Sequence, residues 1–240
     1  NKMIPLQRAP KPDYLTDEKV QELTNQYQLN TKNTVWKSLE IKEPLLESSN
    51  KKCAYCECIL QEKDSYSQIE HFHPKLLYPQ EVVLWDNLLP ACGRCNAHKG
   101  DHNTVKIPII NPYKDVPKEH LSTQAFRLYP KTDMGKITIT RLNLNDNNRL
   151  CIPRFKLCNE VNEKLGHIKD TPDLLDQRNR LYSLLTACSK SGEFSAFCSH
   201  TLHSNTDYTH IKNLLSENEY WDDELAKLDE ETKSIALESR

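Results

Sequence analysis

The sequence is poor in glycine and in long apolar runs. Only 5 of its 240 residues are glycine, and no glycine-rich loop of the kind that cradles nucleotides is present. No uninterrupted apolar stretch approaches the roughly 20 residues that a membrane helix needs, and the start carries no secretory signal. With a mean hydropathy of -0.73, these absences favour a polar, soluble, cytoplasmic protein with no membrane partner.

An excess of positive charge is also missing, because the formal net charge is -2. A self-sufficient DNA-binding protein is usually basic, since neutralisation of phosphates supplies most of its affinity. Any chemistry on nucleic acid would therefore need a partner or a borrowed binding surface.

Nine cysteines are present, and five of them lie at irregular spacings that suggest no disulfide pairing. These five are Cys58, Cys151, Cys158, Cys188 and Cys198. An odd, scattered set suits reduced thiols in a cytosol, and we expect small, buried apolar side chains. The other four form the Cys-x-x-Cys pairs Cys53/Cys56 and Cys92/Cys95. Four thiolates in two such knuckles suit a tetrahedral structural zinc ion.

Apolar spacing predicts secondary structure on both sides of the first cysteine pair. Thr16 is a candidate N-cap of a first helix, and a second helix is expected over about residues 33–46. The alternation of residues 67–71 predicts a strand, and extended character resumes at 82–85 and 87–89.

Residues after the second cysteine pair complete the pattern. Gly93 opens a short helix that ends near Gly100. Residues 126–129 and 136–140 predict a hairpin with its turn at 133–135. Thr171-Pro172-Asp173 begins a helical region, with proline at the first helical position.

A basic stretch covers residues 127–156, where seven lysines and arginines oppose two aspartates. Arg141, Arg149 and Arg154 are our candidates here for nucleic-acid contacts, although a merely solvated basic face fits the same pattern.

The expected fold class is α+β and mostly helical. The expected segments are an N-terminal arm with helices (1–50), a metal-stabilised core (51–112), a strap with a hairpin and basic segment (113–170), and a C-terminal helical region (171–240).

The residues between the cysteine pairs suit phosphodiester hydrolysis, which needs a base and charge stabilisation at the phosphate. His71 is the candidate base because its ordinary pKa lies near neutrality. Glu70 and Asn96 offer hard oxygen ligands for Mg²⁺ or Mn²⁺. Both Glu70 and His71 can reach one site only if the strand ends there. Asn87 is the candidate that orients His71.

Four further residues are open to two interpretations. His73 and His98 are possible phosphate or metal contacts, and His98 is otherwise a solvated helix residue. Lys75 and Lys99 are candidate contacts to the nucleic-acid backbone.

The motifs CAYC, IEHFHPK and NLLPACGRCNAHKG resemble the HNH nuclease family. That resemblance implies a ββα-metal fold, a two-stranded hairpin and a helix around one metal, here stabilised by zinc. It makes His71 the general base, Asn87 the central asparagine, Glu70 the acidic ligand of the catalytic Mg²⁺ or Mn²⁺, and Asn96 the final metal-binding position. Many members have histidine at that last position.

A narrower resemblance covers about residues 52–112 and, more loosely, 137–155. KCAYCE, IEHFHPK and LNLNDNNRL look like the HNH subunits of anti-phage Septu and retron systems, in which an ABC-type ATPase is the partner. The resemblance implies a DNA endonuclease. Hydrolysis by an external water does not require a 2′-OH, so RNA, including tRNA, remains an alternative substrate. A zinc-stabilised adaptor with a silent centre is the alternative from another class.

Overall fold

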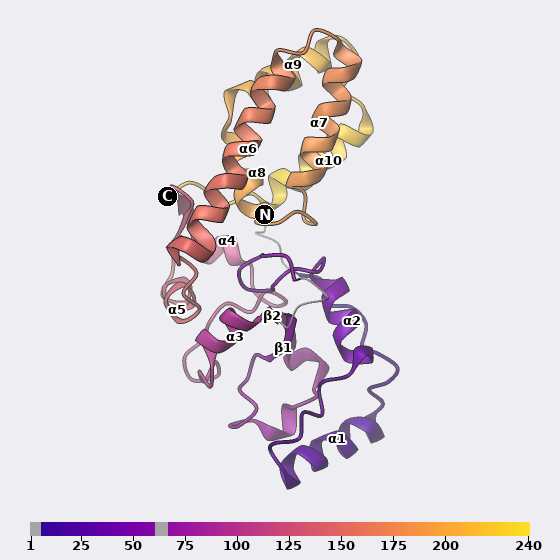
Figure 1. Cartoon of the computed structure of the whole chain (residues 1–240), viewed down its shortest axis with the longest axis vertical. Helices are drawn as coiled ribbons and strands as arrows, with labels where there is room; N and C mark the ends of the chain where they lie inside the picture. The colour runs from indigo at the N-terminus through magenta and orange to yellow at the C-terminus, as the bar shows by residue number, and fades with distance from the viewer. Residues whose placement is uncertain (1–5, 61–66) are drawn as a thin grey trace. The chain divides into compact units, whose positions relative to one another are not determined.

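The computed structural model describes residues 6–60 and 67–240, which form two compact units (Figure 1). The N-terminal unit holds the described residues up to Asp115 together with Lys136–Asn143. The helical unit holds Val116–Gly135 and Leu144–Arg240. The fold class is α+β and mostly helical, as the sequence predicts. The first five residues of the expected N-terminal arm lie outside the described residues.

The N-terminal unit contains a two-stranded sheet and short helices. Its elements are α1 (Asp17–Leu29), α2 (Leu39–Ser48), β1 (Ser67–His71), the 3-10 turns η1 (Pro79–Glu81) and η2 (Trp85–Asn87), β2 (Leu88–Cys92), α3 (Gly93–Lys99) and most of α5 (Asp133–Arg141). Strands β1 and β2 are antiparallel, with Ser67 opposite Cys92 and His71 opposite Leu88. The predicted order of strand, loop, strand and helix is confirmed.

The first predicted helix is confirmed and the second begins later than expected. Thr16 caps α1, where its hydroxyl oxygen accepts a hydrogen bond from the Lys19 N–H at 3.1 Å. Helix α2 begins at Leu39 rather than near residue 33. The preceding residues form turns, and Trp36 is buried in the apolar core instead of continuing a helical stripe.

One apolar core joins α1, α2, both strands and the loop between them. Its buried members are Leu15, Leu23, Tyr27, Trp36, Ile41, Leu45, Ile69, Val82, Val83, Trp85 and Leu88. The prediction of an extended segment at residues 82–85 is wrong. Val82 and Leu84 donate turn hydrogen bonds to the carbonyls of Pro79 and Glu81, so this apolar run reaches the core from turns.

The helical unit is built mainly from five longer helices. Its elements are α4 (Pro117–His120), β3 (Leu121–Gln124), β4 (Arg127–Pro130), the π-helical turn η3 (Asn147–Cys151), α6 (Ile152–Lys169), α7 (Leu174–Cys188), α8 (Ser195–Ser204), α9 (Thr206–Glu217) and α10 (Asp223–Ile235). Helix α6 packs against α7, α8 and α9, while α10 packs against α7 and α8 (Figure 1). None of the helices in the described part of the chain is long and apolar enough to cross a membrane.

Two sequence predictions in the helical unit are corrected. Strand β4 pairs with β3 and not with residues 136–140, which belong to α5. The β3–β4 turn uses Ala125 and Phe126 at φ of 48° and 64°, a left-handed conformation usually signalled by glycine or asparagine. Helix α7 is capped by Asp173 and begins at Leu174, so Pro172 precedes the cap.

Candidate functional site

Four cysteines meet at one point of the N-terminal unit. The sulfur atoms of Cys53, Cys56, Cys92 and Cys95 all lie within 4.8 Å of one another, and all four residues are buried. A tetrahedral zinc ion with Zn–S bonds of about 2.3 Å would separate its sulfurs by about 3.8 Å. The Cys56 and Cys92 sulfurs are 3.9 Å apart. The two predicted knuckles therefore form a donor set that fits a structural metal ion such as zinc.

Backbone contacts bring the knuckles together. The N–H of Ala54, inside the first knuckle, donates to the carbonyl of Pro90 on β2. Cys92 is the N-cap of α3, and its sulfur accepts a hydrogen bond from the Cys95 N–H at 3.4 Å. Hydrogen bonds from the thiols of Cys53 and Cys56 hold the pKa of Cys92 well below its usual range. A zinc ion would bind each of these cysteines as the thiolate.

A fifth thiol lies beside this group. The sulfur of Cys58 is 3.4 Å from that of Cys56, yet Cys58 is only half-buried and lies outside the four-sulfur group. Our expectation of a buried apolar cysteine holds for the other four scattered cysteines but not for Cys58.

His71 ends β1 and is fixed on two sides. Its Nε2 lies 2.9 Å from the carbonyl oxygen of Val82, and its ring meets the Trp36 ring edge to face at a centroid distance of 4.8 Å. A carbonyl oxygen can only accept, so Nε2 carries the proton and Nδ1 keeps a free lone pair. Burial lowers the pKa of His71 to about 3. The imidazole is therefore neutral at pH 7.

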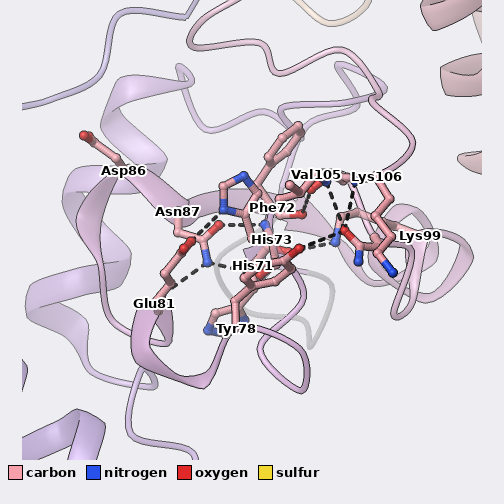
Figure 2. Close-up of polar contacts among 12 residues, drawn as sticks. His71, Phe72, His73, Tyr78, Glu81, Asp86, Asn87, Lys99, Val105 and Lys106 are labelled. Carbon is pink, nitrogen blue, oxygen red and sulfur yellow. Dashed lines mark hydrogen bonds and ion pairs between the residues drawn. The ribbon is translucent and has the colours of Figure 1, made fainter.

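Asn87 holds the loop that follows β1. Its Oδ1 accepts from the His73 N–H at 2.7 Å, and its Nδ2 donates to the carbonyls of His73 at 3.1 Å and Glu81 at 3.2 Å. Figure 2 shows these contacts as dashed lines. Asn87 makes no side-chain hydrogen bond to His71 in the described part of the chain. Val82, the partner of His71, follows Glu81 directly, so Asn87 and the imidazole contact adjacent residues of the same loop, and the orienting role expected for Asn87 stays a prediction.

His73 forms its own pair within the same loop. Its Nδ1 lies 2.6 Å from a carboxylate oxygen of Glu81. The ring centroid lies 5.4 Å from that of Tyr78 and 5.7 Å from that of Phe72. His73 is thus positioned by a carboxylate, while 30% of its side chain remains exposed.

Glu70 and Lys99 form a buried ion pair, with an O–N distance of 2.5 Å and side chains 3% and 1% exposed. Lys99 also donates to the carbonyl of His71 at 2.7 Å. Burial raises the pKa of Glu70 to about 7, against the opposing effect of the Lys99 ammonium. The expectation that Lys99 contacts the nucleic-acid backbone is wrong, because its amine compensates Glu70 inside the protein.

Asn96 and His71 line one cavity of about 580 Å³, and Glu70 is not among its lining residues. The Nδ2 of Asn96 donates to the Oε1 of Gln68 at 2.6 Å. Helix α3 thus contacts β1 through the Asn96–Gln68 and Lys99–Glu70 pairs. In the described residues, only the four cysteines gather three or more metal-binding His, Cys, Asp or Glu side chains.

The remaining candidate residues lie in different settings. Lys75 is half-buried, with its amine 5.2 Å from the centroid of the Trp36 ring. His98 is exposed on α3, and Arg141 is exposed at the end of α5. Arg149 is half-buried in η3.

Arg154 corrects a further expectation, because it is 1% exposed. Its Nη1 donates to the carbonyl of Leu144 at 2.9 Å, and its guanidinium lies 4.4 Å from the centroid of the Phe197 ring. Arg154 therefore stabilises the helical unit and offers no surface contact to phosphate.

The residues that α2 and the turn before it bring to the cavity were not predicted from the sequence. Trp36, Lys37 and Lys42 line the same space as His71. Their spacing carries no motif, and only the packing of this segment against β1 brings them to the site.

Comparison with known proteins identifies relatives of this chain, one of which matches nearly all of it. The Septu protein PtuB of Bacillus thuringiensis is 38% identical over 238 residues, which cover 94% of this chain and 92% of the relative. The Septu protein PtuB of Bacillus mycoides is 36% identical, over 36% of this chain and 39% of its own length. Protein ea31 of Escherichia phage lambda is 27% identical over 68% of this chain and 56% of its own length. No family model matches the chain, and no solved structure matches it.

Proposed function

Because this chain belongs to the Septu PtuB family, we propose that it is the HNH endonuclease subunit of an anti-phage defence complex that acts with an ATPase partner. The proposed reaction is hydrolysis of DNA phosphodiester bonds. The observation that carries the proposal is the neutral His71 imidazole, held by Val82 at the edge of a cavity that Asn96 also lines.

His71 would act as general base through Nδ1, the nitrogen that is not bonded to Val82. Its pKa of about 3 makes it a weak base in the free protein. A phosphodiester in the cavity would place negative charge nearby and raise that pKa, because an opposite charge favours the imidazolium. Substrate binding would thus bring the base closer to the pKa that proton transfer at neutral pH requires.

Glu70 and Asn96 would supply protein oxygens to Mg²⁺ or Mn²⁺. Magnesium commonly takes only one or two protein carboxylates and fills its remaining positions with water and substrate phosphate. Glu70 is 3% exposed and paired with Lys99, so it would bind such an ion only after exchanging the Lys99 ammonium for it. A bound ion would stabilise negative charge at the scissile phosphate and the departing oxygen.

The decisive experiment compares the wild-type chain with His71→Ala and His210→Ala, each purified with the neighbouring ATPase candidate. His210 is an exposed histidine on α9, far along the chain from the candidate site. DNA and RNA, including tRNA, are incubated with and without Mg²⁺ or Mn²⁺ and with and without ATP. We expect DNA cleavage that needs the divalent ion, a loss of at least about 100-fold in His71→Ala, and none in His210→Ala.

Two results would redirect the proposal. Cleavage of RNA alone would change the substrate while keeping His71 as the base, since the attacking water is external. Cleavage by His71→Ala at the wild-type rate would remove His71 from the mechanism.

The Glu70–Lys99 ion pair favours a second candidate function, a zinc-stabilised adaptor with a silent nuclease centre. In that case the carboxylate serves the fold and binds no catalytic ion. The adaptor predicts no effect of divalent metal, and no loss of phage protection when His71 or Asn96 is changed.

A further inference from the structure

The cavity beside His71 has a wall that lies outside the two cysteine knuckles and the residues between them. This wall is formed by residues 34–42, the turn before α2 together with its first helical turn. It contributes Trp36, Lys37 and Lys42 to the lining, which also includes residues of β1 and Asn96 of α3. A segment more than 25 residues before His71 in the sequence therefore shapes the space in which His71 would act.

The charged side chains among the described lining residues are all positive. Lys37, Lys42 and Lys75 all line the cavity, and none of them forms an ion pair in the described part of the chain. The described lining residues include no carboxylate. The acidic residues of α2, Glu40, Glu43 and Glu47, are exposed and do not line the cavity.

Three unpaired ammonium groups around one cavity repel one another, and a bound polyanion would relieve that repulsion. Lys75 is restrained over the Trp36 ring at 5.2 Å, and Trp36 itself is 8% exposed and packed on His71. Trp36 is therefore too buried to stack on a base, and it holds Lys75 close to the imidazole.

The two side-chain amides that line the cavity are poorly placed to recognise nucleic-acid bases. The amides of Gln68 and Asn96 are bonded to each other at 2.6 Å, so they are not both available to read base edges. Lysine ammonium groups bind phosphate without regard to sequence. The chemistry of the wall thus matches a phosphodiester backbone.

We propose that Lys37 and Lys42, together with Lys75, bind phosphates on either side of the scissile one, which makes residues 34–42 the substrate-binding wall of the nuclease. This inference rests on the proposed function for the identity of the substrate. It assigns binding to Lys37 and Lys42, which lie outside the residues on which the family resemblance depends.

The test measures binding apart from cleavage. His71→Ala serves as the parent, and Lys37→Gln/Lys42→Gln is compared with Lys32→Gln in that background. Lys32 is an exposed lysine between α1 and α2 that does not line the cavity. Affinity for labelled single-stranded and duplex oligonucleotides is followed by fluorescence anisotropy over a range of salt concentrations. Tryptophan emission and zinc content confirm that each variant is folded.

The plot of log K against log salt has a negative slope. Loss of two phosphate contacts should make that slope less steep by about 1.4 for single strands or about 1.8 for duplex DNA, while Lys32→Gln leaves it unchanged. A 5′-mononucleotide should bind far more weakly than the oligonucleotides, because it offers one phosphate to several lysines. An unchanged slope in the double variant, equal binding of the mononucleotide, or no binding by the parent at low salt would each overturn the inference.

Failure of the proposed nuclease function and failure of the binding inference give different results. If the wild-type complex cuts no nucleic acid but the double variant still loses salt dependence, the wall binds nucleic acid and the catalytic proposal alone is wrong. If the wild type cuts and the double variant cuts with an unchanged KM, the wall is not the binding surface and the nuclease proposal stands.

Discussion

Replacement of Cys56 by serine, compared with the same change at Cys58, tests the metal site directly. The two sulfurs are only 3.4 Å apart, but only Cys56 belongs to the group whose sulfurs lie within 4.8 Å of one another. A structural zinc site contributes about 10–16 kcal/mol in small modules, whereas a whole domain has a net stability of about 5–15 kcal/mol. Loss of one ligand should therefore remove most of the stability of the N-terminal unit.

We expect wild-type protein and Cys58→Ser to carry one zinc ion per chain and to differ in stability by about 1 kcal/mol or less. Cys56→Ser should purify with little zinc. Zinc is measured by atomic absorption, and unfolding is followed by tryptophan emission. Trp36 and Trp85 are buried in the N-terminal unit, and only Trp221 belongs to the helical unit. Emission therefore reports chiefly on the unit that holds the metal site.

Two outcomes would refute this assignment of ligands. Zinc retained by Cys56→Ser and lost from Cys58→Ser would make Cys58 the fourth ligand. A wild-type protein that is folded without zinc and indifferent to a chelator would show that the four thiols are held together by packing alone.

Three other substitutions have defined outcomes. Asn87→Ala should reduce the free energy of unfolding by about 2–4 kcal/mol in denaturant titrations, because it leaves buried backbone groups of the loop unpaired; a loss below about 1 kcal/mol would contradict the role given to Asn87. Lys99→Met should cost about 3–5 kcal/mol by leaving Glu70 without its counter-charge. The pKa of Glu70 would then rise beyond about 7, so the folded state would keep a proton that the unfolded state releases near pH 4.3. The loss of unfolding free energy caused by Lys99→Met should thus grow as pH rises from 6 to 8. The loss should be smaller in Lys99→Met/Glu70→Gln, which has no buried carboxyl group to titrate. Arg154→Met should destabilise the helical unit by about 2–4 kcal/mol, through its lost hydrogen bond and cation–π contact, and leave the salt dependence of nucleic-acid binding unchanged; a reduced slope would restore Arg154 as a phosphate contact.

The elements predicted correctly are those with a strong local signal. Thr16 caps α1 as expected, and the alternation of residues 67–71 corresponds to β1. Each cysteine pair lies within four residues, so its local geometry follows from the Cys-x-x-Cys motif. The only long-range contact to be predicted was that between the two pairs, and two such motifs in one sequence already indicate a shared metal ion.

The errors arise where tertiary contacts decide. Gly135 suggested a turn, yet it lies within α5, where an added Cβ would stand 2.1 Å from the carbonyl oxygen of His120. The glycine serves close packing and not a hairpin. The true β3–β4 turn has no glycine or asparagine at its left-handed positions, Ala125 and Phe126. Apolar residues 82–85 looked like a strand because burial alone does not distinguish a strand from a turn that faces the core.

The candidate site was predicted only in part for a related reason. A lysine is ordinarily predicted to lie at the surface, and the residues next to Lys99 in the sequence do not indicate that it is buried against Glu70. Lys37 and Lys42 were missed for the opposite reason, since they look like ordinary solvated residues until the fold brings them beside His71.

The Lys99 amine also gives the candidate site an occupant of its own. A divalent ion bound at Glu70, as we propose, would meet a carboxylate whose charge Lys99 already compensates, so its binding would be an exchange of cations and not a simple addition. Such an exchange would be favoured if the incoming ion gained further oxygen ligands, and the phosphates of a bound nucleic-acid strand would provide them. Without a strand, the resting protein keeps a tethered cation that cannot diffuse away.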